Sequence, residues 1–66
     1  MNIAQFTKPE LDYFRNTCNF VGIEKELFEL RSRGHTLEEI AEITNMSVDG
    51  IKKVSRRVNK KILKAL

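Results

Sequence analysis

The chain has 66 residues, of which 41% are hydrophobic and 32% are charged, and its formal net charge at pH 7 is +3. This balance indicates one folded domain with a small core and excludes a disordered chain. Because Cys18 and His35 are the only cysteine and histidine, a disulfide framework and a structural zinc site are excluded as well.

The chain shows no acid–base pair, nucleophile system or phosphate-binding loop. We therefore expect a binding module rather than an enzyme, and we expect no cofactor. The sequence also has no apolar run of about 18 residues and no signal-peptide-like start. These features predict a soluble, cytoplasmic protein.

Charge is distributed unevenly along the chain. Residues 1–50 carry five basic and nine acidic residues, a net charge of −4, whereas residues 51–66 carry seven basic residues and no acid. Such a segregation favours an anionic partner, either nucleic acid or a membrane surface.

The first half of the chain predicts two helices. Residues 1–6 have no clear pattern and are expected to form a flexible arm. Thr7 and Glu10 form a capping box that begins a first helix with one apolar face, and this helix is expected to end within residues 16–19. A second helix is expected from about Ile23 to Arg33, with Gly34 at the position of a left-handed C-terminal cap.

The second half predicts a short third helix and a long fourth one. Thr36 and Glu39 form another capping box, and the third helix should turn Leu37, Ile40 and Ala41 inward. Ser47 is the expected cap of the fourth helix, which meets no breaker after Gly50 and should reach the C-terminus. No segment alternates like a strand, so we predict an all-α fold in which residues 1–66 form a single four-helix domain.

Residues 36–62 have the spacing of a helix-turn-helix. The close crossing of its two helices requires a small residue, and Ala41 is at that position. The tight turn requires a residue that tolerates positive φ, and Asn45 is at that position. The predicted core contacts of the unit are all apolar: Ile40, Met46, Val48, Ile51 and Val54. A plain helical hairpin produces a similar pattern, so the motif alone leaves that alternative open.

The fourth helix carries an apolar stripe and a basic stripe on opposite faces. At 100° per residue its apolar residues share one direction. The opposite side carries mainly cations, with one acid: Asp49, Lys53, Arg56, Arg57, Lys60 and Lys64, flanked by Lys52 and Lys61. A helix with one buried and one cationic face suits docking into the major groove of DNA, with its first turns at base edges and later cations at phosphates.

The stretch GHTLEEIAEITNMSVDGIKKVSRRVNKKI resembles the C-terminal promoter-reading region of bacterial sigma factors and the related LuxR/GerE-type DNA-binding domains. The similarity covers about residues 20–63. It implies that the helix beginning after Ser47 enters the major groove, with Val48, Asp49, Lys52 and Lys53 near the DNA. Gly50 departs from the pattern, because those families carry Arg or Thr there. Since nothing in the chain matches a promoter-melting region, we expect a small regulator rather than a complete sigma factor.

We therefore predict sequence-specific binding of double-stranded DNA by a transcriptional regulator. The expected base-contacting residues are Asp49, Lys53, Arg56 and Arg57. The expected phosphate-contacting residues are Thr36, Leu37, Ser47, Lys52, Lys60 and Lys61. RNA polymerase or another protein is a further expected partner, and a homodimer would add the specificity that one short helix lacks.

Two other classes of function compete with this prediction. Gly50 and the acidic first half favour a protein-interaction module that kept the fold but lost DNA reading. The segment IKKVSRRVNKKILKAL resembles a basic membrane-surface helix. Because the core of so small a domain needs the apolar face of this segment, we expect no membrane partner.

The remaining residues receive structural interpretations. We expect Cys18 and the aromatic residues to pack in the core and His35 to be exposed in a loop. Phe28 and Leu63 fall off the main apolar stripes and are interpreted as packing on a neighbouring helix or forming a dimer contact. The acids of the second and third helices are expected to form a solvated face directed away from DNA: Glu24, Glu26, Glu29, Glu38, Glu39 and Glu42.

Overall fold

The computed structural model describes residues 1–66 and contains helices and no strands. This confirms the predicted all-α class with four α-helices, to which a short 3-10 helix is added. The elements in chain order are η1 (Ile3–Gln5), α1 (Lys8–Thr17), α2 (Ile23–Ser32), α3 (Leu37–Thr44) and α4 (Val48–Ala65).

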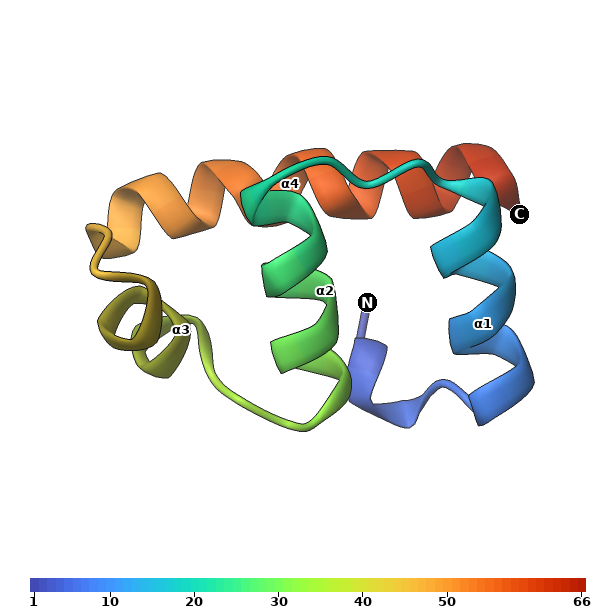
Figure 1. The fold of residues 1–66 in the computed structure, drawn as a ribbon, viewed down its shortest axis with the longest axis horizontal. Coiled ribbons are helices and arrows are strands. Elements are labelled where there is room, and N and C mark those ends of the chain that lie inside the picture. The colour runs from blue at the N-terminus through green and yellow to red at the C-terminus, as the bar shows by residue number, and fades with distance from the viewer.

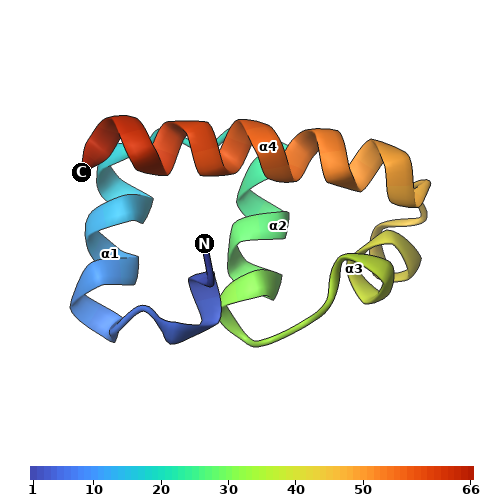
Figure 2. The same cartoon turned by 180° about the vertical axis from the view of Figure 1, so that it is seen from behind.

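Helix α4 forms the long axis of the molecule, and the other helices meet it from one side (Figure 1). At 1.5 Å per residue its 18 residues span about 27 Å, close to the 29 Å longest dimension of the chain. Figure 2 shows the same arrangement from behind, with α1 at the C-terminal end of α4 and α3 at its N-terminal end. One face of α4 is therefore covered along its whole length.

The helix starts follow the predicted caps. Thr7 with Glu10, and Thr36 with Glu39, form complete capping boxes at α1 and α3. The Ser47 hydroxyl accepts the backbone N–H of Gly50 at the start of α4. Each cap satisfies donors that a helix cannot satisfy internally, so these boundaries are set by local sequence.

Left-handed backbone positions define the joints between helices. Asn45 ends α3 at φ 58°, and Gly34 follows α2 at φ 90°, as the sequence predicts. The joint between α1 and α2 adds two more, Asn19 at φ 53° and Gly22 at φ 55°. The three residues Asn45–Ser47 link α3 to α4, so these two helices are joined by a short turn.

The core lies between α4 and the helices that meet it. Its fully buried side chains are Phe28, Leu27, Ile40, Ile51, Ile62 and Val58. Phe28, which its own helical stripe leaves aside, packs on Phe20 with ring centroids 4.7 Å apart. Helix α2 contacts η1, α3 and α4, so more than one of its sides is covered.

Three expectations for the core differ from the structure. Tyr13 does not pack in the core with the other aromatic residues, because it is 49% exposed and its hydroxyl donates to the backbone carbonyl of Ala65 at 2.7 Å. Residues 1–6 are not a flexible arm, because η1 places Ile3 in the core at 3% exposure. Met46 is not a core contact of the helix-turn-helix, since it follows the left-handed Asn45 and its side chain is 36% exposed. Val48 is half-buried and packs against the core as predicted.

Candidate nucleic-acid interface

The covered face of α4 fixes the direction of its other face. Ile51, Val54, Val58 and Ile62 are buried at spacings of three and four residues. Five cations on the remaining surface are exposed and form no ion pair within the chain: Lys52, Lys53, Arg56, Lys60 and Lys64. We call these five residues the outer basic face.

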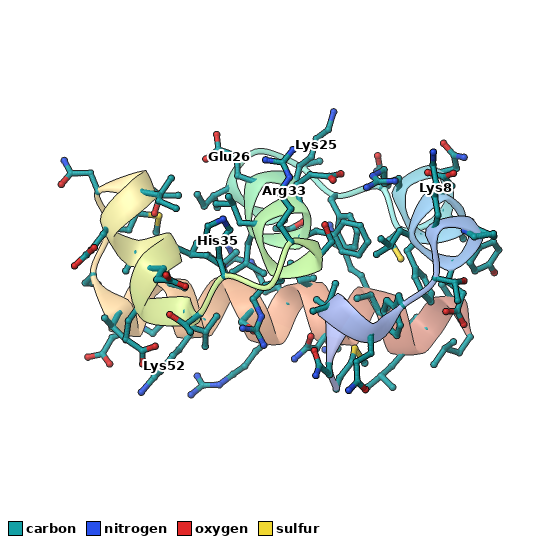
Figure 3. All side chains as sticks on the ribbon, turned by 90° about the horizontal axis from the view of Figure 1, so that it is seen from below. Lys8, Lys25, Glu26, Arg33, His35 and Lys52 are labelled. Carbon is teal, nitrogen blue, oxygen red and sulfur yellow. The ribbon has the colours of Figure 1, made fainter.

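The outer basic face is confined to α4. In Figure 3, Lys52 extends from α4 on one side of the molecule, whereas Lys25 and Glu26 of α2 lie toward the opposite side. Lys25 therefore does not extend this surface. Among the predicted base-contacting residues, Asp49, Lys53 and Arg56 are exposed and share the direction opposite the buried stripe.

Arg57 and Lys61 turn instead toward Glu24 of α2. The Arg57 Nε donates to Glu24 Oε2 at 3.2 Å, and the Lys61 Nζ donates to Glu24 Oε1 at 2.5 Å. Lys61 also donates to the backbone carbonyl of Asn19 at 3.2 Å. The structure thus separates these two cations from the outer basic face and ties them to the body of the domain.

Glu24 was expected in a solvated acidic face, and this expectation is wrong. Its side chain is 7% exposed, and the backbone N–H of Val21 also donates to it at 3.2 Å. The hydrogen bond from Lys61 lowers the pKa of Glu24, which burial alone would raise, and the Val21 N–H and Arg57 lower it further. The carboxylate is therefore charged and fully paired at neutral pH.

The signal that locates Glu24 is present in the sequence but easily missed. Leu27 and Phe28 lie three and four residues after it, so the three share one side of α2. Leu27 and Phe28 are both fully buried. An acid on such a face must find partners, and a basic helix is their natural source.

The beginning of α3, where the sequence predicts phosphate contacts, carries the acidic residues Glu38 and Glu39. The Thr36 N–H donates to the Glu39 carboxylate at 2.8 Å, and this bond lowers the pKa of Glu39. The Thr36 hydroxyl accepts the N–H of Glu39 at 3.1 Å. Leu37 is half-buried, and Glu38 and Glu42 are exposed nearby on the same helix. A phosphate approaching the predicted contacts Thr36 and Leu37 would meet these carboxylates.

Gly50 lies in a confined position below the cap of α4. A Cβ atom there would lie 3.1 Å from Ser47 Oγ and 3.4 Å from Met46 Cε. The Ser47 hydroxyl is already engaged by the N–H of Gly50 at 3.0 Å. The predicted phosphate contact Ser47 is thus exposed, but its acceptor oxygen is used in the helix cap.

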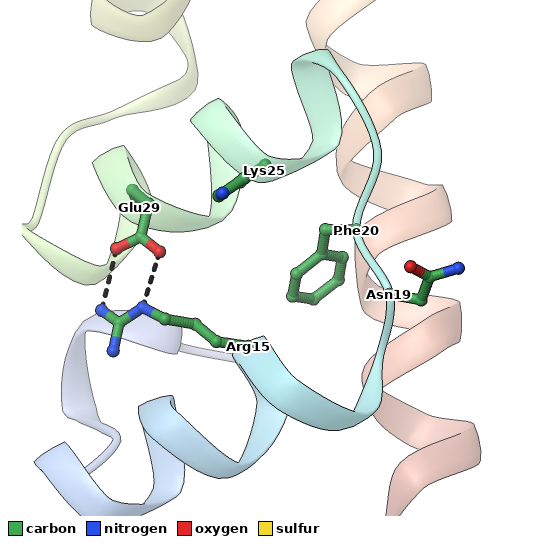
Figure 4. A pocket seen from close by; sticks show the side chains of 5 residues that line it. All are labelled: Arg15, Asn19, Phe20, Lys25 and Glu29. Carbon is green, nitrogen blue, oxygen red and sulfur yellow. Dashed lines mark hydrogen bonds and ion pairs between the residues drawn. The ribbon is translucent and has the colours of Figure 1, made fainter.

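A second ionic cluster joins α1 to α2 and lines a hollow of about 100 Å³ (Figure 4). The Arg15 guanidinium binds both carboxylate oxygens of Glu29, at 2.6 and 2.8 Å, and also Asp12 at 2.6 Å. The hydrogen bond from Arg15 lowers the pKa of Glu29. Because both groups are already paired, this cluster holds two helices together rather than offering a free binding group.

The remaining candidate residues have structural surroundings. Cys18 is buried as expected, and burial raises the pKa of its thiol. His35 was expected to be exposed but is half-buried, and its Nδ1 lies 3.8 Å from Glu39 Oε1. No three His, Cys, Asp or Glu side chains lie together in a way that could hold a metal ion. No helix of the chain has the combination of length and apolar character needed to cross a membrane.

Searches of protein-family models, curated proteins and solved structures find no match to this chain.

Proposed function

We propose that the chain binds double-stranded DNA through the outer basic face of α4. One observation supports this proposal above all. Helix α4 carries five exposed cations without acidic partners, while its opposite face is buried in the core. Like charges at helical spacings of three and four residues repel one another. A polyanion relieves this repulsion, and its phosphates release counterions on binding.

The helix-turn-helix supplies the docking geometry. The first turns of α4 would enter the major groove, where Asp49, Lys53 and Arg56 face outward. Lys52 and Lys60 would bind phosphates on either side of the groove. The acids at the start of α3 favour a contact dominated by α4 rather than one shared equally with α3.

The resemblance to sigma-factor and LuxR/GerE-type domains supports a role in transcription regulation. RNA polymerase is a partner that this resemblance implies. A homodimer would double the number of base contacts, and Leu63, which is 60% exposed on α4, is available for such a contact.

Salt dependence tests the proposal. If the five cations of the outer basic face together displace the counterions of about five phosphates, the logarithm of the affinity for a mixed-sequence duplex should fall with the logarithm of salt concentration at a slope of about −4 to −5. Fluorescence anisotropy between roughly 50 and 200 mM salt measures this slope. A flat dependence would overturn the proposal, because the cations of α4 would then not be the interface.

A protein-interaction module is the second candidate, and the surface of α3 favours it. Glu38, Glu39 and Glu42 are exposed there beside Ile43, which is 57% exposed. This acidic and apolar surface suits a basic protein partner better than it suits DNA. Absence of duplex binding at micromolar protein and low salt would favour this second function over the first.

A further inference from the structure

An open hollow of about 280 Å³ lies beside the C-terminal half of α4. Its lining consists of four cations and one acid: Arg57, Lys60, Lys61, Lys64 and Glu24. The cations follow one another at spacings of three and four residues, which places neighbouring side chains about 5–6 Å apart at Cβ. The hollow thus brings together four of the seven cations of α4.

The single acid of the hollow is committed to holding two of its cations. Glu24 is 7% exposed and binds Lys61 through one carboxylate oxygen and Arg57 through the other. Lys61 is further fixed by the carbonyl of Asn19. The carboxylate therefore cannot turn outward to neutralise Lys60 or Lys64.

Arg57 keeps part of its guanidinium free. It uses Nε for Glu24, its side chain is 56% exposed, and its two terminal nitrogens make no hydrogen bond within the chain. An arginine anchored through one nitrogen presents the others in a fixed direction, which is the geometry that binds phosphate oxygens through two parallel bonds. Lys60 and Lys64 line the same hollow without any acidic partner.

We propose that this hollow binds a phosphate group, held by Arg57, Lys60 and Lys64, with Glu24 and Lys61 as the pair that positions Arg57. The assignment of that phosphate to a phosphodiester of duplex DNA rests on the proposed function. Arg57 is then a phosphate-contacting residue rather than a base-contacting one. The phosphate contact at the C-terminal half of α4 would then help to position the helix along the DNA, in addition to the contacts of its first turns.

Two probes distinguish phosphate binding at the hollow from the assignment of that phosphate to DNA. Inorganic triphosphate reports on phosphate binding in the absence of DNA, and a mixed-sequence duplex reports on DNA binding. The test variant is Arg57→Ala with Lys64→Ala, and its control is Lys52→Ala with Lys53→Ala, which removes the same charge from the other end of α4. Affinities are measured by titration calorimetry, and shifts of backbone amide NMR signals locate the bound triphosphate.

The test variant should lose about tenfold or more in triphosphate affinity, because charge-assisted hydrogen bonds are lost, and the control should lose less than about twofold. The same test variant should bind the duplex more weakly. Equal losses of triphosphate affinity in both variants would overturn the proposal, since only general charge attraction would remain. Unchanged duplex binding by the test variant would overturn it too, while leaving the proposed function standing.

Failure of the proposed function has a different signature. Wild-type protein that binds triphosphate at the hollow but binds no duplex would keep the phosphate site and refute DNA as its source. Tighter binding to vesicles of anionic phospholipid than to the duplex would likewise refute DNA as the source.

Arg57→Lys guards against a folding artefact. This variant keeps the charge but replaces the planar guanidinium with one ammonium, which cannot hold Glu24 through one nitrogen and present two parallel N–H groups to a phosphate. With circular dichroism showing a folded chain, it should still lose several-fold in triphosphate affinity. Wild-type affinity in Arg57→Lys would contradict the anchored-guanidinium geometry.

Discussion

Lys60 and Lys61 are adjacent lysines with opposite expected roles, and replacing each by methionine separates them. Lys61 is 32% exposed in its side chain and donates to the nearly buried Glu24 at 2.5 Å, whereas Lys60 is exposed and unpaired. Losing a charge-assisted hydrogen bond costs about 1.5–3 kcal/mol. Because Arg57 and the Val21 N–H still bind Glu24, we expect Lys61→Met to lower the free energy of unfolding by about 2 kcal/mol.

Urea unfolding followed by circular dichroism measures this difference. Lys60→Met should stay within about 0.5 kcal/mol of wild type, because its side chain contacts solvent. For a domain of this size, the Lys61→Met loss corresponds to a fall of about 10 °C in melting temperature. Equal stabilities of the two variants would refute the view that Lys61 is a structural cation.

Acid should reduce the difference between wild type and Lys61→Met. The pKa of Glu24 in the folded chain lies below its ordinary value of 4.5, chiefly because of Lys61. A carboxylate with a lowered folded-state pKa stabilises the fold above its unfolded-state pKa, and this contribution is lost as the pH falls through the folded-state pKa. The stability gap should therefore be full at neutral pH and should shrink below pH 4.5. A gap independent of pH would mean that the ionised carboxylate is not its cause.

Five further substitutions test the core, the turn and the proposed DNA contacts. Ile3→Ala should cost about 2–4 kcal/mol in urea unfolding, because the side chain is 3% exposed; a flexible arm would show no change. Asn45→Ala should cost about 1 kcal/mol by thermal unfolding, because alanine tolerates φ 58° poorly, whereas Asn45→Gly should not lose stability. Lys53→Ala should cost about 1–3 kcal/mol on a duplex selected from random sequences and much less on mixed DNA. Lys60→Ala should weaken both equally and reduce the salt slope by about one unit; equal losses for both variants would remove Lys53 as a base reader.

Local sequence determined the helices and the joint that matters most. Thr36 with Glu39, Ser47 with Gly50, and Asn45 act within three or four residues along the chain. Their backbone hydrogen bonds and positive φ do not depend on distant packing, so α3, its turn and the start of α4 were predictable. The apolar stripe of α4 was predictable for the same reason, because one face of a helix is fixed by a spacing of three and four residues.

Only tertiary packing decided which side chains off those stripes are covered. The apolar stripe of a helix predicts which face of that helix is buried, but it does not predict how many other helices pack around it. Helix α2 meets η1, α3 and α4, so Phe28 and Glu24 are buried although they lie beside its main stripe. Glu24 then pairs with cations 33 and 37 residues away, a match that depends on how α2 crosses α4. The division of the α4 cations into a free outer face and a pair held by Glu24 follows from that crossing, because burying a carboxylate requires partners that only the folded chain brings near.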